Sequence, residues 1–181
     1  MNKRESVVVK KAKSIDQSKI KISLPRSIID GKSYNFDVIY NDTETLTIQF
    51  PRCQLFSGFY ESDGKCYCEI AIPTEGLTKQ LYFDIAFRIG DLLKEDRKFR
   101  DISFTGHIRN VINDFSCLRL KLPQNKSKIT TTFVSKENTA LSLSNFVEGI
   151  TMIPIVSIEH AYLFNETYGF NLLLKQVVIL E

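Results

Sequence analysis

The feature that most constrains the fold is a repeated alternation of apolar and polar residues in short segments separated by turn signals. Segments 34–40 and 45–50 alternate on either side of "NDTE" (41–44), which predicts a β-hairpin. Pro51 marks the end of its second strand, because proline cannot donate a hydrogen bond within a sheet. The first regular elements that the sequence predicts are therefore β-strands.

The same alternation continues further along the chain. After a turn at Ser62–Gly64, segment 65–72 predicts a strand with Cys66, Cys68, Ile70 and Ile72 on one face and Tyr67, Glu69 and Ala71 on the other. Segment 117–122 predicts another, with leucines on one face and Arg119 and Lys121 on the other. Further strands are predicted at 129–134, 149–158 and 169–180, and the last two are apolar on both faces, as in central strands.

One long segment breaks this pattern. Leu77, Leu81, Ile85, Ile89 and Leu93 recur every four residues, which predicts an amphipathic helix over 77–96. Similar spacing predicts a short second helix at 107–115. About seven strands and one dominant helix make the chain a β-rich α+β protein, a barrel or sandwich with a helical insertion.

Composition limits the broad class of protein. Hydrophobic residues make up 43% and charged residues 25% of 181 residues, as in a soluble domain, and no apolar run is long enough to cross a membrane. Residues 1–26 hold eight Lys or Arg and two acidic residues, a balance of +6 within a total of +3. We expect a basic, partly flexible N-terminal arm at 1–26, followed by a single domain at 27–181.

The cysteines first suggest a metal or thiol site. The four, at positions 53, 66, 68 and 117, are too few and too widely spaced for a disulfide scaffold, which predicts free thiols in a reducing intracellular compartment. Structural zinc usually takes four ligands, often in two close pairs, and Cys66 and Cys68 have no second pair. Phosphate-loop and catalytic motifs are absent. We predict no metal, no cofactor and no enzymatic activity.

A surface that binds single-stranded nucleic acid remains as a candidate. Such surfaces combine basic side chains that follow the phosphates with aromatic rings that stack on the bases. The stretch 52–67 combines these residue types, and the stretch 119–128 adds four basic residues. The candidate binding residues are Arg52, Phe56, Phe59, Tyr60, Lys65, Tyr67, Arg119, Lys121, Lys126 and Lys128. The sequence leaves open whether the rings face a ligand or the protein core.

The order of elements also carries a family resemblance. Phe50-Pro51 is followed by Phe56-x-Gly58-Phe59-Tyr60, the strand at 65–72, the long helix, the segment 99–122 and a closing strand opened by Tyr168-Gly169-Phe170. Over residues 34–180 this layout resembles the single-stranded DNA-binding proteins of large nucleocytoplasmic DNA viruses, which are related to phage-type replicative proteins with an OB-fold. The resemblance implies an OB-fold-like barrel with extra strands and one long inserted helix.

The resemblance also implies a function. It implies sequence-independent binding and protection of single-stranded DNA during viral replication, recombination or repair, in the host cytoplasm, a viral factory or the nucleus. Viral replication proteins and further copies of the chain are additional candidate partners, and no membrane is expected. The alternatives are a viral structural protein, such as a minor capsid or jelly-roll-like β-sandwich component, and an interaction module that does not bind nucleic acid.

Overall fold

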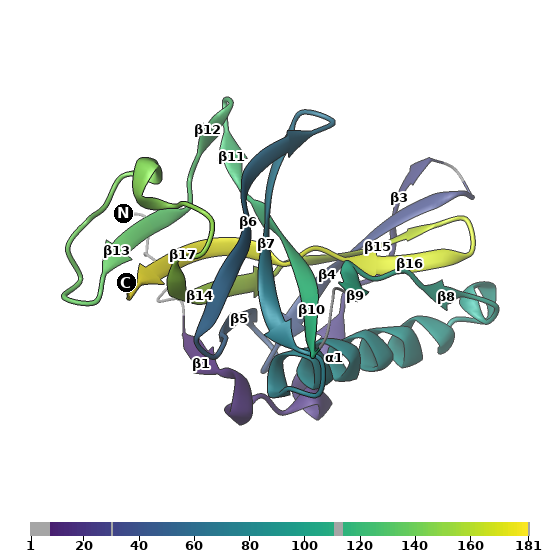
Figure 1. Cartoon of the computed structure of the whole chain (residues 1–181). Helices are drawn as coiled ribbons and strands as arrows, with labels where there is room; N and C mark the ends of the chain where they lie inside the picture. Colours follow the sequence, from purple (N-terminus) through teal and green to yellow (C-terminus); the bar gives the residue numbers. More distant parts are fainter. Residues whose placement is uncertain (1–7, 30, 111–113, 181) are drawn as a thin grey trace, which may run out of the picture.

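Five strands of the computed structural model, which describes residues 8–29, 31–110 and 114–180, close into a barrel. They are β6 (Cys53–Ser62), β7 (Lys65–Pro73), β10 (Phe115–Leu122), β14 (Thr151–Ile158) and β17 (Leu173–Ile179). Around the barrel the order is β6-β7-β10-β17-β14 and back to β6 (Figure 1). The strands β10 and β17 run parallel and the other neighbours antiparallel. The predicted OB-fold-like barrel is confirmed.

Further strands extend the barrel into a larger sheet. The second half of β14 pairs with β5 (Glu44–Gln49), and β4 (Ser33–Tyr40), β15 (His160–Phe164), β16 (Thr167–Phe170) and β8 (Ser103–Phe104) follow in that order. The short strands are β1 (Val9–Lys11), β2 (Ile20–Ile22), β3 (Arg26–Ile29), β9 (Ile108–Asn110), β11 (Gln124–Asn125), β12 (Lys128–Ile129) and β13 (Thr132–Ser135). The 3-10 helices are Ala12–Ser14, Gln17–Lys19, Arg97–Phe99 and Leu143–Asn145.

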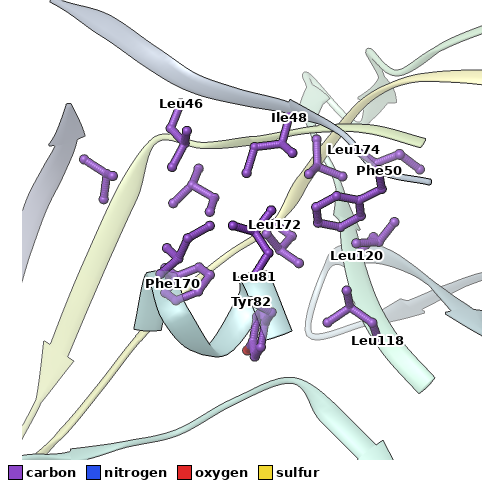
Figure 2. Packing of buried hydrophobic residues seen from close by; sticks show 14 of the residues in the cluster. Leu46, Ile48, Phe50, Leu81, Tyr82, Leu118, Leu120, Phe170, Leu172 and Leu174 are labelled. Carbon is purple, nitrogen blue, oxygen red and sulfur yellow. The ribbon is translucent and has the colours of Figure 1, made fainter. Parts of the chain in front are cut away.

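The predicted long helix is α1 (Leu77–Lys94), which lies between β7 and β10 in the chain. Leu81, Ile85, Ile89 and Leu93 of its four-residue repeat lie on the buried face, whereas Leu77 is 44% exposed. Leu81 and Tyr82 reach into a core with Leu120, Phe170 and other apolar side chains (Figure 2). The Tyr168 hydroxyl donates a hydrogen bond to the Ala86 carbonyl at 3.0 Å. A β-carbon at Gly90 would lie 2.2 Å from that hydroxyl, so the helix approaches β16 closely only because residue 90 is glycine.

The second helix, predicted at 107–115, is wrong for the residues that the structure describes. Ile108–Asn110 form β9, which pairs with β10, and Phe115 begins β10 itself. Residues 111–113 lie outside the described part of the chain. Ile108 lies opposite Leu118 in this pairing. The helical spacing is overridden because the backbone groups of β9 find partners on a neighbouring strand.

The predicted N-terminal arm belongs to the folded body over its described part, residues 8–26. The strand β1 pairs with β5, β2 pairs with β4, and Ile20 is fully buried. Ala12 and Ile15 are buried too. The basic side chains of this stretch therefore lie on a packed segment, because its apolar residues are needed to cover the core beside α1.

Other differences concern strand bounds. The predicted last strand, 169–180, is divided at Asn171–Leu172 into β16 and β17. The predicted strand at 129–134 is β13 at Thr132–Ser135, because residues 128–129 pair with β11 instead. The stretch Cys53–Ser62, predicted only as a cluster of aromatic residues, is a barrel strand whose pairing with β7 shifts register twice.

Candidate nucleic-acid interface

The outward faces of β7 and β10 form a continuous surface, which we call the β7–β10 face. It carries Tyr67 and Glu69 from β7 and Arg119 and Lys121 from β10, because Cys66, Cys68 and the leucines of β10 point into the barrel. The register places Lys121 opposite Tyr67 and Arg119 opposite Glu69. In OB-folds, the second and third strands and the adjacent loops are the surface that binds oligonucleotides.

Two tyrosines and an arginine contact one another on this face. The rings of Tyr60, from β6, and Tyr67 lie 5.9 Å apart between centroids, tilted by 31°. The guanidinium carbon of Arg119 lies 4.9 Å from the centre of the Tyr67 ring, within range of a cation–π interaction. Three residues predicted from two separate stretches of sequence thus lie together, and their planar groups offer surfaces on which a base can stack.

Histidine 107 holds Arg119 in place. The Nη2 atom of Arg119 lies 2.6 Å from Nδ1 of His107, and the His107 backbone N–H donates to the Tyr82 hydroxyl at 2.9 Å. Burial, and then the charge of Arg119, lower the pKa of His107 to about 4. The ring is therefore neutral at pH 7, and its Nδ1 accepts the hydrogen bond, since an arginine can only donate.

Two lysines widen the positive surface toward the β6–β7 turn. Burial, and then the charge of nearby Lys65, lower the pKa of Lys121. Lys65 begins β7 directly after the turn at Asp63-Gly64, whose positive φ angles of 52° and 68° fit a two-residue hairpin loop. The predicted turn is confirmed. Like charges held this close are disfavoured without a counterion, which makes the pair suited to an anionic ligand.

A second hairpin stands beside the first. Strands β11 and β12 follow directly after β10, and their hairpin projects from the barrel on the same side as the β6–β7 hairpin (Figure 1). Lys126 and Ser127 form its two-residue loop with φ angles of 48° and 65°, which places Lys126 at the tip and Lys128 just after it, both exposed. These lysines add two positive charges beyond the end of β10.

The remaining predicted residues lie apart from the Tyr60–Tyr67–Arg119 contacts. Arg52 is exposed just before β6, at the end of that strand away from Tyr60. Phe56 and Phe59 occupy the two places where β6 shifts register against β7, and they are 40% and 44% exposed. Arg52 thus precedes β6 while both phenylalanines lie on it, and neither phenylalanine is a core residue.

Sequence reasoning missed four residues of this surface: Glu69, His107, Arg109 and Tyr162. Arg109 and His107 lie in the segment predicted as a helix, and Arg109 forms an ion pair with Glu69. Tyr162, on β15, lies near Arg119 and Tyr67 of the face. Burial raises its pKa, the charge of Arg119 lowers it, and Tyr67 raises it. Of the four, only Glu69 could have been found from the sequence, because the alternation of the segment 65–72 places its acidic side chain on the outward face.

Cys53, Cys66 and Cys68 lie in the barrel wall and not in a polar site. Cys66 and Cys68 are buried among apolar side chains, and burial raises the pKa of both thiols. Cys53 has a pKa raised to about 12, again by burial. Over residues 8–29, 31–110 and 114–180, no group of three or more His, Cys, Asp or Glu side chains is arranged to hold a metal ion.

Comparison with known proteins adds no relative. No family model matches this sequence, and no curated protein matches it significantly. The resemblance to viral single-stranded DNA-binding proteins therefore stays a prediction. Within the described part of the chain, no helix has the length and apolar character needed to cross a membrane.

Proposed function

We propose that this chain binds single-stranded DNA without marked sequence preference through the β7–β10 face. The observation that carries the proposal is the set of contacts between Tyr60, Tyr67 and Arg119, flanked by Lys65 and Lys121. The rings and the guanidinium plane would stack on the bases, and the lysines would pair with the phosphates. This is the combination that sequence-tolerant binding needs, because every base has a flat face and every nucleotide a charge.

The fold supports the same proposal. The face lies on the second and third strands of a closed OB-fold-like barrel, where oligonucleotides bind in this architecture. A closed barrel also favours this proposal over the jelly-roll alternative, which needs two packed sheets. We further propose that the bound strand is protected during viral replication, recombination or repair, and that viral replication proteins and other copies of the chain are its protein partners.

A direct titration tests the proposal. We expect a fluorescently labelled oligo-dT to show a saturable rise in polarisation with the purified protein at ~50 mM salt, and a steep loss of affinity as salt increases. Absence of binding at ~50 mM salt would refute the proposal. A stable assembly of the chain that ignores oligonucleotides would instead support the structural alternative.

A double variant tests the aromatic residues. We expect Phe59→Ala with Tyr60→Ala to weaken oligo-dT binding by roughly tenfold or more, because each stacked base contributes about 1–3 kcal/mol. Phe87→Ala is the matched control, since Phe87 is 62% exposed on α1. If the double variant is folded by circular dichroism and binds like the control, the aromatic assignment is wrong even though DNA binding survives.

A further inference from the structure

A pocket of about 340 Å³ opens at the edge of the β7–β10 face, next to β9. Its lining residues are Tyr60, Glu69, Gly106, His107, Ile108, Arg109 and Arg119. The volume falls at the lower end of the range of roughly 300–1,000 Å³ typical of small-molecule pockets. Because Tyr60 and Arg119 belong both to the pocket and to the stacking surface, the pocket lies directly beside that surface.

Glu69 is the one acidic residue among those lining residues. It is only 6% exposed, and its Oε2 forms an ion pair with Arg109. Its Oε1 accepts a long hydrogen bond of 3.4 Å from the Tyr60 hydroxyl. A carboxylate at this place repels phosphate, so it opposes the charge that the rest of the face provides. A carboxylate on a DNA-binding face is better suited to contact a base than the backbone.

The chemistry of the four bases distinguishes what a carboxylate accepts. Guanine presents two neighbouring donors, N1–H and the N2 amino group, which match the two oxygens of a carboxylate. Thymine presents one N–H between two carbonyl oxygens, which a carboxylate repels. Adenine and cytosine each present an amino group beside a ring nitrogen that is itself an acceptor. Guanine is therefore the base that a carboxylate binds best through its Watson–Crick edge.

We propose that Glu69 makes this pocket a guanine subsite within the single-stranded DNA-binding face, an inference that rests on the proposed function. One guanine enters beside the Tyr60 ring and donates from N1 and N2 to the Glu69 carboxylate. The Arg109 side chain, 63% exposed, exchanges its ion pair with Glu69 for a contact with the backbone phosphate of that nucleotide. Binding elsewhere on the face stays independent of sequence, so the subsite adds a preference to a general affinity.

A simpler explanation is that Glu69 only orients Arg109 toward phosphates. The two explanations differ in their dependence on the base. If Glu69 orients Arg109, its replacement changes the affinity for every oligonucleotide by the same factor. If Glu69 binds guanine, its replacement changes the affinity only where guanine is present, apart from a uniform gain caused by removing one negative charge.

The experiment uses labelled oligo-dT of about twelve nucleotides and the same strand with one central guanine or one central inosine, which lacks the N2 amino group. With the unmodified protein we expect the guanine strand to bind roughly tenfold more tightly than oligo-dT, the scale of one bidentate contact to a base. Inosine keeps only one of the two donors, so we expect most of this gain to be lost. This comparison needs no protein variant.

Glu69→Gln then tests the residue itself. We expect the guanine preference to fall below about twofold, because glutamine offers one acceptor where glutamate offers two. Glu61→Gln is the matched control, since Glu61 is an exposed acid at the end of β6, and this variant should keep the preference. Thermal unfolding of each variant shows whether it is folded; where Glu69→Gln is not, the comparison of guanine with inosine decides.

Each outcome has a defined meaning. Binding of oligo-dT without a guanine preference overturns the subsite and leaves the proposed function intact. A preference for guanine that Glu69→Gln retains, or that inosine reproduces, also overturns it. Absence of binding to all three strands refutes the proposed function, and the subsite with it.

Discussion

The lysines of the β11–β12 hairpin allow the electrostatic part of the proposal to be tested without touching the barrel. Lys126 and Lys128 are exposed at a loop, and neither forms an ion pair with another residue in the described part of the chain. Replacing both with glutamine removes two positive charges and leaves polar side chains that are one bond shorter. The fold should be unaffected, because surface substitutions usually change stability by less than about 0.5 kcal/mol.

The expected effect follows from counterion release. For single-stranded nucleic acid, each neutralised phosphate contributes about 0.7 to the slope of log affinity against log salt concentration. If each lysine neutralises one phosphate, Lys126→Gln with Lys128→Gln lowers the slope by about 1.4. Over one decade of salt, from ~1 M to ~0.1 M, this difference corresponds to roughly 25-fold in affinity. The loss should be equal for oligo-dT and for strands of other composition.

Polarisation titrations at four or five salt concentrations measure the salt slope of the unmodified protein and that of the hairpin variant. Lys94→Gln with Lys98→Gln is the matched control, because these two exposed lysines lie at and just after the end of α1, away from the hairpins (Figure 1). We expect the control to keep the slope of the unmodified protein. If the hairpin variant keeps the slope of the unmodified protein, the assignment of Lys126 and Lys128 to phosphates is refuted. It is also refuted if the slope falls by the same amount in the hairpin variant and in the control.

Two further predictions concern stability. Gly90→Ala should lower the free energy of unfolding by roughly 1–2 kcal/mol despite the better helix propensity of alanine, since the new β-carbon meets Tyr168. Gly58→Ala is the control, because Gly58 has open space around it. Equal melting temperatures for the two variants would refute this packing. The folded-state pKa of His107, about 4, lies below its ordinary 6.5, so its contribution to stability is present above pH 6.5 and lost as pH falls toward 4. Urea unfolding at pH 7 and pH 5 should show a smaller loss for His107→Gln than for the unmodified protein, and an equal loss would count against the assignment.

The barrel strands show what local sequence can predict. In β7 and β10 the alternation identified which side chains enter the core, and this alone placed Tyr67, Arg119 and Lys121 on the outside. These three residues share one face only because β7 and β10 pair antiparallel. This pairing places Lys121 opposite Tyr67, although α1 lies between the two strands in the chain. The long helix was equally predictable, because its repeat is carried by consecutive turns.

The wrong helix prediction and the burial of part of the N-terminal stretch have a common physical cause. Ile108 fits a helical repeat, but its backbone pairs with Leu118 on β10, and hydrogen bonds between distant segments leave no trace in local spacing. The N-terminal stretch is basic in composition, yet Ile20 is fully buried against the rest of the fold. In both places tertiary contacts outweigh the local sequence signal.

Glu69 shows why the polar part of the candidate site could not be derived in the same way. The alternation places it outward on β7, where an isolated acid would normally be solvated. Its side chain contacts Tyr60 on the neighbouring strand β6 and Arg109 on β9, a short strand that pairs with β10 and not with β7. The charge that conflicts most with phosphate binding is thus the one most enclosed by the fold. Arg109 is the charged partner of Glu69 in this structure, and the donor edge of guanine is the partner that we propose for it when DNA is bound.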